Sequence, residues 1–257
     1  MRTPNLLKTL VISWALVLAV PGMAAEPAKA EAAALVITYQ VALPDRPALR
    51  RELQTGGIRK LQQWKDSGFL ADYRLYYNRF ADTDNWDAMA LLRFASPAAA
   101  LQWQATDTSA PEALTPQLAT LVRSIHATPV TMARRLGSAP ASAHTVAMVI
   151  PYISLVSTSD YLKYADGYMG PQFEGMIQES ALSHYELFLS TFPTARPWSS
   201  LVVLEYQDSE ALATRDALES KVRGRLAQRP EWKAFSDTKK SIREEKQVVI
   251  AEPITLR

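Results

Sequence analysis

The sequence predicts an α+β protein in which one βαββαβ unit occurs twice in tandem. A shift of 112 residues aligns an aromatic frame without a gap, and short β-branched runs alternate with helical segments in the same order in both parts. A small, polar stretch over 137–143 separates the two parts. The identical pairs are Tyr73 with Tyr185, Leu75 with Leu187, Phe80 with Phe192, Trp86 with Trp198 and Leu92 with Leu204. Shared register together with shared pattern favours duplication over chance.

Composition narrows the class of protein. The chain has 257 residues, 48% of them hydrophobic, with 9 glycines and no cysteine, so it is neither collagenous, disordered nor held by disulfides. It carries 28 basic and 26 acidic side chains; without the first 25 residues, which hold Arg2 and Lys8 and no acid, 26 of each remain and the formal net charge is zero. This balance argues against a nucleic-acid partner, because such proteins usually gather a basic excess on one face.

The first residues are typical of an export signal. Arg2 and Lys8 precede an apolar run over 10–20, which is followed by a Pro-Gly pair and then by small residues that suit a signal peptidase. The run has 11 residues, about half of what a membrane-spanning helix needs. We therefore expect cleavage, no stable membrane anchor, and a periplasmic or secreted protein. The expected organisation is a signal peptide over 1–25, a linker over 26–34, a first ferredoxin-like repeat over 35–136, a linker over 137–144 and a second such repeat over 145–257.

Each repeat is predicted to open with a strand followed by a helical region. The first strands are apolar and β-branched runs over 36–43 and 146–155. In the first repeat, apolar residues recur at helical spacing around an interruption at Gly56-Gly57. In the second, the cap at Ser157–Ser159 leads into a helix that breaks near Gly170-Pro171. The helical positions are Leu49, Leu53, Ile58, Leu61 and Trp64 in one repeat, and Tyr161, Tyr164, Tyr168, Phe173, Met176 and Ile177 in the other.

A pair of strands, a second helix and a last strand complete each repeat. The paired strands are predicted over 72–80 with 86–94 and over 184–192 with 198–206, and turn-prone residues join each pair. Thr115 caps the second helix of the first repeat, with Pro116 in its first turn and Leu118, Leu121, Val122 and Ile125 on one face. A charged helix with Trp232, Phe235 and Ile242 takes its place in the second repeat. The last strands are predicted over 129–136 and 247–254.

The order β-α-β-β-α-β is that of the split βαβ or ferredoxin-like unit. With the Trp at the head of the third strand and the strand ends Phe94-Ala-Ser-Pro97 and Tyr206-Gln-Asp-Ser209, the chain resembles the dimeric α+β barrel superfamily, which includes antibiotic-biosynthesis-monooxygenase-like and stress-responsive barrel domains. The resemblance covers nearly all of the chain after the signal, through pattern rather than a diagnostic motif. It implies that two antiparallel sheets pair face to face within one polypeptide, as a monomeric pseudo-dimer.

Charge supports internal pairing. At aligned positions the two repeats carry opposite or complementary groups: Arg74 with Glu186, Arg93 with Glu205, and Asp72 with His184. In a symmetric homodimer like charges would meet near the axis, so this divergence favours pairing within one chain. The alternative is that these are unrelated solvent-facing charges, which contribute little.

The best candidates for chemistry lie on the second strand of each repeat. Alternation puts Arg74, Tyr76 and Asn78 on one face, and His184 with Glu186 on the matching face. If that face lines the barrel, His184 is a candidate base oriented by Glu186, and Arg74, Tyr76 and Asn78 are candidate contacts to a polar ligand. The alternative is a satisfied polar pair. No metal site is predicted, because two ligands without a third or a thiolate are too few.

Tyrosines form a second candidate ligand site. Tyr161 and Tyr164 share a helical face, and Tyr39 and Tyr152 lie on the first strands. Their hydroxyls suit the edge of a pocket for an aromatic ligand, while core packing is the alternative. His126 follows an expected helix and is predicted to cap it, because the helix dipole favours an imidazolium there.

Several classes of chemistry have no matching motif. The chain has no phosphate-binding Gly-rich loop, G-x-S-x-G elbow or H-E-x-x-H. Haem-degrading members of the superfamily use an Asn, a Trp and an axial His; Asn85, Trp86 and His126 supply these types, but their expected places on a hairpin turn and a helix end do not match. We therefore carry no such role over and predict no cofactor.

Three functions remain open. The first is a barrel that binds a small hydrophobic or aromatic molecule, which includes a cofactor-independent monooxygenase or isomerase, as the resemblance implies. The second is a non-catalytic periplasmic ligand-binding protein, and the third is a partner-binding module with a filled interior. An enclosed cavity touched by His184 or Arg74 would favour the first two, and a packed interior would favour the third.

Overall fold

The strands of this protein form one closed antiparallel barrel. The computed structural model describes residues 33–106, 114–139 and 144–255; the predicted signal peptide and parts of both predicted linkers lie outside them. The strands are β1 (Ala33–Val41), β2 (Leu70–Asn78), β3 (Ala88–Phe94), β4 (Val122–Gly137), β5 (Val146–Ser154), β6 (His184–Ser190), β7 (Ser200–Tyr206), β8 (Arg243–Glu245) and β9 (Val249–Pro253). They follow the order β7-β6-β4-β1-β3-β2-β9-β5, and β5 pairs with β7 to close the ring, while β8 pairs with β5 alone.

Both parts of the chain place their strands in the same order. The first part runs β4-β1-β3-β2 and the second runs β9-β5-β7-β6, and the two are joined by the pairs β4–β6 and β2–β9. Because every pairing is antiparallel, β1, β2, β5 and β6 run in one direction and β3, β4, β7 and β9 in the other. The barrel therefore has one end where β1, β2, β5 and β6 finish, called here the cavity end, and one where they begin, called the charged end.

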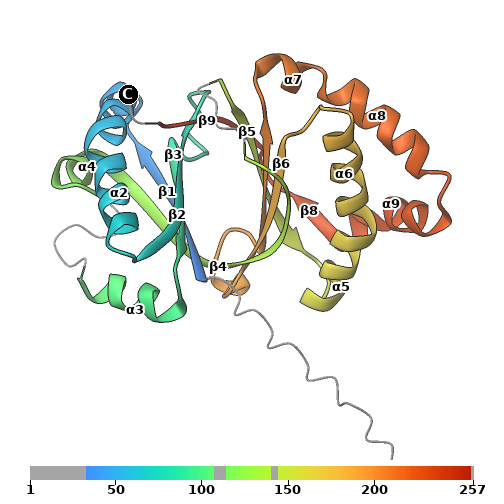
Figure 1. Ribbon diagram of the computed structural model, residues 1–257, viewed down its shortest axis with the longest axis horizontal. Coiled ribbons are helices and arrows are strands. Elements are labelled where there is room, and N and C mark those ends of the chain that lie inside the picture. Colours follow the sequence, from blue (N-terminus) through green and yellow to red (C-terminus); the bar gives the residue numbers. More distant parts are fainter. Residues whose placement is uncertain (1–32, 107–113, 140–143, 256–257) are drawn as a thin grey trace, which may run out of the picture. The chain divides into compact units, whose positions relative to one another are not determined.

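Helices cover the outside of the barrel (Figure 1). Those of the first part are α1 (Arg46–Glu52), α2 (Ile58–Asp66), α3 (Pro97–Thr106) and α4 (Pro116–Leu121); those of the second are α5 (Thr158–Tyr164), α6 (Gly170–Gln178), α7 (Ser209–Ala213), α8 (Arg215–Leu226) and α9 (Pro230–Ile242). Short 3-10 turns, η1 (Leu43–Asp45) and η4 (Pro193–Ala195), follow β1 and β6, and π turns, η2 (Leu53–Gly57) and η3 (Ala165–Met169), join α1 to α2 and α5 to α6. The interruption predicted at Gly56-Gly57 is thus a π turn within a continuing helical segment, since the local backbone stays right-handed.

Strand alternation divides the core into three parts. Leu35, Ile37 and Tyr39 of β1 pack beneath the helices of the first part, while Ala34 and Val36 face the lumen. A second helix–sheet core holds the equivalent residues of the second part. The lumen is filled at its middle by Val36, Tyr76, Met89, Leu91, Val130, Val149, Phe188, Leu201, Val203 and Val249. This shared core is apolar and buried, so it holds the two parts together through the hydrophobic effect.

The end of α4 corrects one sequence-based prediction. Thr115 caps this helix as expected, its side chain accepting a hydrogen bond from the Leu118 backbone N–H. The helix ends at Leu121, however, and Val122 opens β4, so His126 lies in a strand and cannot cap a helix. The apolar spacing of Val122 and Ile125 suited either structure, and pairing with β1 decides for the strand.

Within the described ranges, no helix is long and apolar enough to cross a membrane.

Candidate functional site

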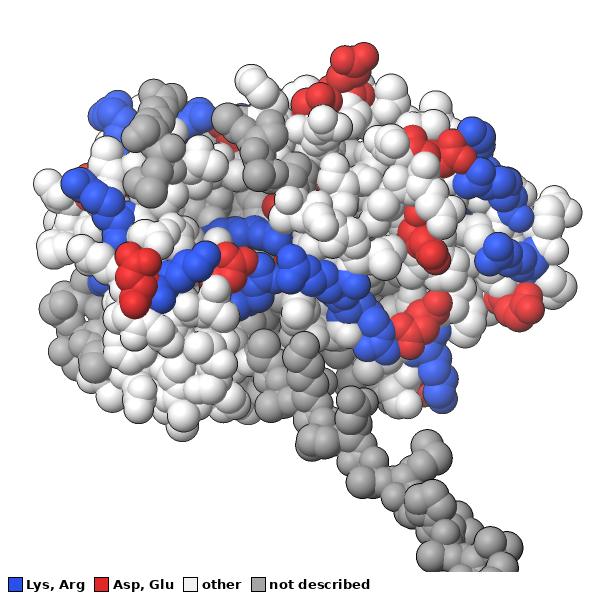
Figure 2. Space-filling view, in the orientation of Figure 1, with Lys and Arg blue, Asp and Glu red and all other residues white. Residues whose placement is uncertain are grey.

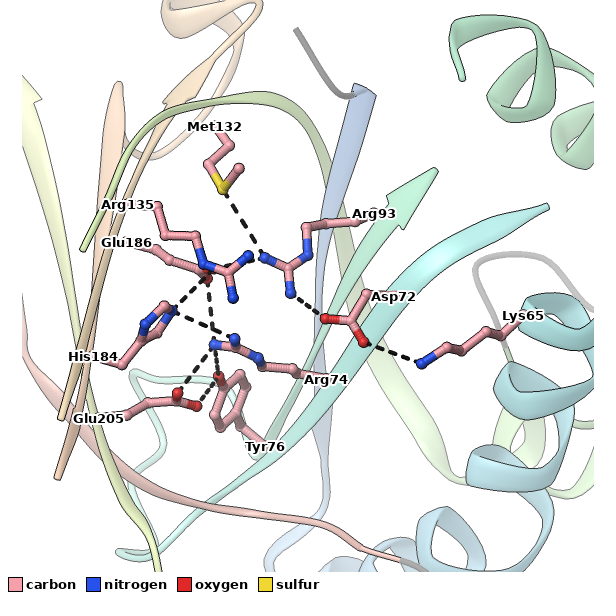
Figure 3. Close-up of polar contacts among 10 residues, drawn as sticks. All are labelled: Lys65, Asp72, Arg74, Tyr76, Arg93, Met132, Arg135, His184, Glu186 and Glu205. Atoms are coloured by element: carbon pink, nitrogen blue, oxygen red, sulfur yellow. Dashed lines mark hydrogen bonds and ion pairs between the residues drawn. The ribbon is translucent and has the colours of Figure 1, made fainter. Parts of the chain in front are cut away.

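Four buried charges lie together at the charged end of the lumen (Figure 3). Arg74 on β2 and Arg93 on β3 come from the first part, and Glu186 on β6 and Glu205 on β7 come from the second. Arg74 Nη1 lies 3.4 Å from Glu186 Oε2 and 3.1 Å from Glu205 Oε2, and Arg93 Nη1 lies 2.6 Å from Glu186 Oε1. These contacts cross between the parts, so the charges are paired rather than solvent-facing.

The pairing differs in detail from the sequence alignment. Arg74 meets Glu186 as expected, whereas Arg93 pairs with Glu186 and Asp72, not with Glu205. Glu205 pairs with Arg74 at 3.1 Å and also accepts a hydrogen bond from the Tyr76 hydroxyl at 2.7 Å. Burial and the Glu205 carboxylate raise the pKa of Tyr76 well above its usual range, so the tyrosine stays a neutral donor. The ion-pair partners of Arg93 and Glu205 are therefore determined by tertiary packing, and sequence alignment alone could not identify them.

His184 and Glu186 lie side by side, as predicted, with His184 Nε2 3.1 Å from Glu186 Oε1. Burial acts to raise the pKa of Glu186, but the hydrogen bond from His184 and the charges of Arg74 and Arg93 outweigh it and lower the pKa to about 2. The carboxylate is therefore fixed as an anion. It also lies 3.6 Å from Arg135 Nε.

Access argues against a direct chemical role for this pair. The side chains of His184 and Glu186 have no exposed area, and a general base must come within hydrogen-bond reach of its substrate. A groove of about 320 Å³ at this end touches Asp72, Arg74 and Glu205. A row of mostly basic side chains, interrupted by acidic ones, crosses the molecular surface shown in Figure 2.

The burial of His184 and Glu186 favours a role in an internal ion network, and their catalytic role stays a prediction.

A larger cavity opens at the opposite end of the barrel. It has a volume of about 550 Å³ and is lined by Thr38, Tyr39, Gln40, Thr83, Asp84, Asn85, Trp86, Ser124, His126, Pro151, Pro197, Trp198, Lys246 and Gln247. These residues come from the ends of β1 and β5, from both strand connections 79–87 and 191–199, and from the residues that begin β4 and precede β9. Both parts of the chain therefore build it. Trp86 and Trp198, which the 112-residue shift aligns, both line its wall.

Buried polar contacts fix the connection that carries Asn85 and Trp86. Asp87 accepts a hydrogen bond from the Val41 backbone N–H at 2.8 Å and pairs with Arg46, whose other guanidinium nitrogen donates to the Asn78 carbonyl at 2.7 Å. The Asn78 side chain donates to the Trp86 carbonyl at 2.9 Å. Asn78, predicted as a ligand contact, thus positions the wall of the cavity instead of pointing into it.

Hydrogen bonds also tie the rim together. Asp82 accepts from Asn85 Nδ2 at 2.7 Å and from Gln247 Nε2 at 2.8 Å, which links the two parts across the mouth of the cavity. Gln40 Nε2 donates to the Thr83 carbonyl at 2.6 Å. Ser124 Oγ lies 3.3 Å from His126 Nε2, and His126 is exposed to the opening.

The predicted tyrosine site is a packed core. Tyr161 and Tyr164 are fully buried between helices and sheet, and Tyr161 accepts a hydrogen bond from Ser200 at 2.7 Å. Tyr152 packs there too, with the Arg243 guanidinium 3.8 Å above its ring. The side chain of Tyr39 packs in the first helix–sheet core, although the residue contributes to the cavity lining. Of the tyrosines, only Tyr39 is brought to the cavity.

The sequence named three cavity residues without placing them together. Asn85, Trp86 and His126 line one cavity because His126 lies on β4 and not at a helix end. His126 is exposed at the rim and its Nε2 contacts Ser124, which does not fit a buried iron ligand, so the haem-degrading roles are not carried over. Among the described residues, no group of three His, Cys, Asp or Glu side chains is placed to hold a metal ion. The sequence analysis did not identify Thr38 or Gln247 as candidate site residues, and it identified Trp198 only through its alignment with Trp86.

Comparisons with known proteins find similarity in structure alone. No protein-family model matches the sequence. No curated protein matches it either. A "putative monooxygenase" from Lactobacillus acidophilus superposes with a TM-score of 0.57 at 10% identity, covering 88% of this chain and 95% of the other.

Two further solved structures show the same arrangement. An anthrone oxidase-like protein superposes with a TM-score of 0.54 at 12% identity, covering 89% of this chain and 94% of the other. A mutant chlorite dismutase from Candidatus Nitrospira defluvii, in complex with cyanide, gives 0.53 at 12% identity over 88% and 91% of the two chains. Identity this low shows the fold alone. The chain accordingly has the α+β barrel fold that its sequence pattern predicted, closed within a single polypeptide.

Proposed function

We propose that this protein binds a small, largely apolar or aromatic molecule in the cavity at the cavity end of the barrel. One observation carries the proposal: a cavity of about 550 Å³ is lined by Trp86 and Trp198, with hydroxyl, amide and imidazole groups on its wall. Ligand cavities of this kind measure about 300–1,000 Å³ and combine aromatic walls with a few polar groups. The packed middle of the lumen favours a pocket at the end over a channel through the barrel.

The sequence analysis required a cavity touched by His184 or Arg74 as support for ligand binding, and the structure meets this requirement only in part. The cavity is not touched by His184 or Arg74, although a smaller groove of about 320 Å³ touches Arg74 at the charged end. The middle of the lumen is packed, which supports the partner-binding alternative. The volume and its two tryptophans support a ligand instead, because large, rigid aromatic side chains are favoured anchors at binding sites. We therefore place ligand binding first and partner binding second.

The test is a fluorescence titration with 8-anilinonaphthalene-1-sulfonate as an aromatic probe. Trp86→Ala and Trp198→Ala should each weaken binding about tenfold or more, because each removes one aromatic wall. Leu101→Ala, which truncates a 68% exposed side chain on α3, is the control. Equal affinity in all four proteins would place the probe elsewhere and contradict the proposal.

Oxygen-dependent turnover is a second candidate function. It is supported by His126, an imidazole within the cavity, and by the names of the structural neighbours given above. In such a reaction a base removes a proton from an activated CH₂ group, and O₂ oxidises the anion to a ketone with release of one water. Oxygen uptake with anthrone tests it: one O₂ consumed per anthraquinone formed supports an oxidase, and binding without uptake supports a non-catalytic ligand-binding protein.

We further propose that the two parts are copies of one ferredoxin-like unit and that the protein is a monomer. The matching strand orders and the oppositely charged aligned positions support this. Native mass spectrometry that shows a stable dimer would contradict the monomer.

Export to the periplasm or beyond the cell remains a proposal that rests on residues 1–25. Intact mass measurement of the exported protein should give a chain that begins near Glu26. A cell-associated chain that keeps residues 1–25 would contradict it.

A further inference from the structure

The two walls of the cavity differ in polarity although they occupy matching places. In the first part, Thr38 on β1 pairs in register with His126 on β4. In the second part, β5 pairs Val149 with Val249 on β9 and Tyr152 with Glu245 on β8, so the register shifts by one residue between the two pairs. The Lys246 backbone N–H donates to the Pro151 carbonyl at 2.9 Å, which places Lys246 beside Pro151. Tyr39 opposite Ala88 and Tyr152 opposite Ser200 confirm that Thr38 and Pro151 hold matching positions. One wall thus presents a hydroxyl and an imidazole, and the other presents a proline and an exposed ammonium group.

The polar group on the first wall is directed at the cavity. Ala34 and Val36 face the lumen, so Thr38 lies on the same strand face. Val130 faces the lumen on β4, which puts His126 and Ser124 on the lumen side as well. Cross-strand neighbours hold their Cβ atoms about 5 Å apart, so the Thr38 hydroxyl and the His126 ring can meet one ligand atom together.

The second wall offers less to a polar ligand. Pro151 has no N–H and no polar side-chain atom. Lys246 Nζ already donates to Glu244 at 2.6 Å, and Gln247 Nε2 already donates to Asp82 at 2.8 Å. The tryptophans, in contrast, lie at aligned positions on both sides. The charged residues that line the cavity, Asp84 and Lys246, are both exposed and of opposite sign, so neither sign of ligand charge is favoured.

We infer that the ligand is a flat apolar molecule with one hydroxyl or carbonyl group at an edge, held against Trp86 and Trp198 with that group turned toward Thr38 and His126. The inference rests on the proposed function and adds to it the polarity and orientation of the ligand. A symmetric pocket would accept the ligand in two orientations. Thr38 in place of Pro151, with His126 paired beside it, selects one orientation.

Isothermal titration calorimetry with 1-naphthol and naphthalene tests the inference, because the two probes differ by one hydroxyl. The wild-type protein should bind 1-naphthol about tenfold more tightly than naphthalene, as expected for one or two hydrogen bonds. Thr38→Val and His126→Gln should each reduce that ratio severalfold and leave naphthalene affinity nearly unchanged. The matched control is His144→Gln, which makes the same substitution before β5 at the charged end, outside the cavity lining.

The outcomes separate the inference from the proposed function. Equal affinity of the wild-type protein for both probes overturns the inference and leaves ligand binding standing. A preference for 1-naphthol that survives in both Thr38→Val and His126→Gln also overturns it, because other residues then supply the hydrogen bonds. Failure of both probes to bind overturns the proposed function together with the inference. A ratio that falls in the two variants and stays unchanged in His144→Gln supports both.

Discussion

At the scale of single residues, four charged side chains with little access to solvent dominate the charged end of the lumen. Arg93, Glu186 and Glu205 are at most 6% exposed, and the Arg74 side chain is 12% exposed. A buried ion pair adds little net stability over an apolar replacement, but a lone buried charge is costly. We therefore expect these residues to act chiefly on specificity, by making each part complementary to the other and repulsive toward a copy of itself.

Charge reversal at Arg74 tests this role. Arg74→Glu should lower the free energy of unfolding by about 3–5 kcal/mol, because it brings a third carboxylate beside Glu186 and Glu205. Adding Glu186→Arg should recover part of the loss, but not all, since Arg93 then faces a new cation. Urea unfolding of the four proteins of the cycle measures the coupling. Additive losses would argue against the contact, and Arg134→Glu at the exposed pair with Asp166 should change stability by less than about 1 kcal/mol.

Acid should destabilise the protein through Glu186. Its pKa in the folded state is about 2, below the usual 4.5, so the carboxylate contributes stability above pH 4.5, and this is lost as the pH falls through 2. The contribution is at most about 3 kcal/mol. The wild-type protein should therefore have a larger free energy of unfolding than Glu186→Gln at pH 5. The difference between the two, measured by urea titration, should become smaller toward pH 2. A gap that does not change between pH 5 and pH 2 would contradict this, and Asp166→Asn at an exposed pair serves as the control.

At the scale of elements, the connection 79–87 between β2 and β3 decides the shape of the cavity. Its residues lack regular pairing of their own, so their position depends on the buried pair Arg46–Asp87 and on Asn78. β4 is the other decisive element, because it continues past β1 to pair with β6 and so joins the two parts. Gly137 at its end has a φ of +74°, and a Cβ there would meet the Ser183 carbonyl oxygen at 2.3 Å, so the end of β4 requires glycine.

Removing the carboxylate of Asp87 should disturb both stability and binding. Asp87→Ala leaves Arg46 as a buried, unpaired charge and should lower the free energy of unfolding by about 3–5 kcal/mol. It should also weaken 8-anilinonaphthalene-1-sulfonate binding, because Asn85 and Trp86 lose their anchor. Adding Arg46→Met should restore part of the stability, since an apolar side chain replaces the stranded charge. No recovery in the double variant, measured by urea unfolding, would contradict this account.

At the scale of the described barrel, the sheet has no boundary between the two parts. The pairs β4–β6 and β2–β9 continue the hydrogen-bonded ladder from one part to the other, and a single apolar cluster fills the lumen from both. Neither part can open without exposing that cluster to water. We therefore expect the barrel, with its two helix-covered sides (Figure 1), to unfold as one cooperative structure.

Calorimetry tests this cooperativity. Differential scanning calorimetry should show one transition with equal calorimetric and van't Hoff enthalpies, because the two parts lose their shared core together. Two resolved transitions would show that the parts unfold independently. Arg74→Glu, which weakens contacts between the parts, should lower the transition temperature without splitting the peak.

The sequence by itself determined the elements whose signals are local. Strand alternation and helical spacing predicted most strands and helices, and the 112-residue alignment predicted that Arg74 and Glu186 meet and that Trp86 and Trp198 hold matching places. The prediction that His126 caps a helix was wrong, because the spacing of Val122 and Ile125 fits a helix and a strand equally well. Only the pairing of β4 with β1 distinguishes the two. The sequence also indicated Tyr161 and Tyr164 as candidate ligand contacts, since periodicity marks a shared face but not what covers it.

Tertiary structure alone decided where the open space lies. Periodicity along a strand says which side chains share a face, but a cavity exists only where the faces of several distant strands fail to fill the volume between them. Closing the barrel packed the middle of the lumen and left room at the end where Thr38, Trp86, His126 and Trp198 converge. The partners of Arg93 and Glu205 were settled in the same way, because each buried charge pairs with the opposite charge that packing brings nearest.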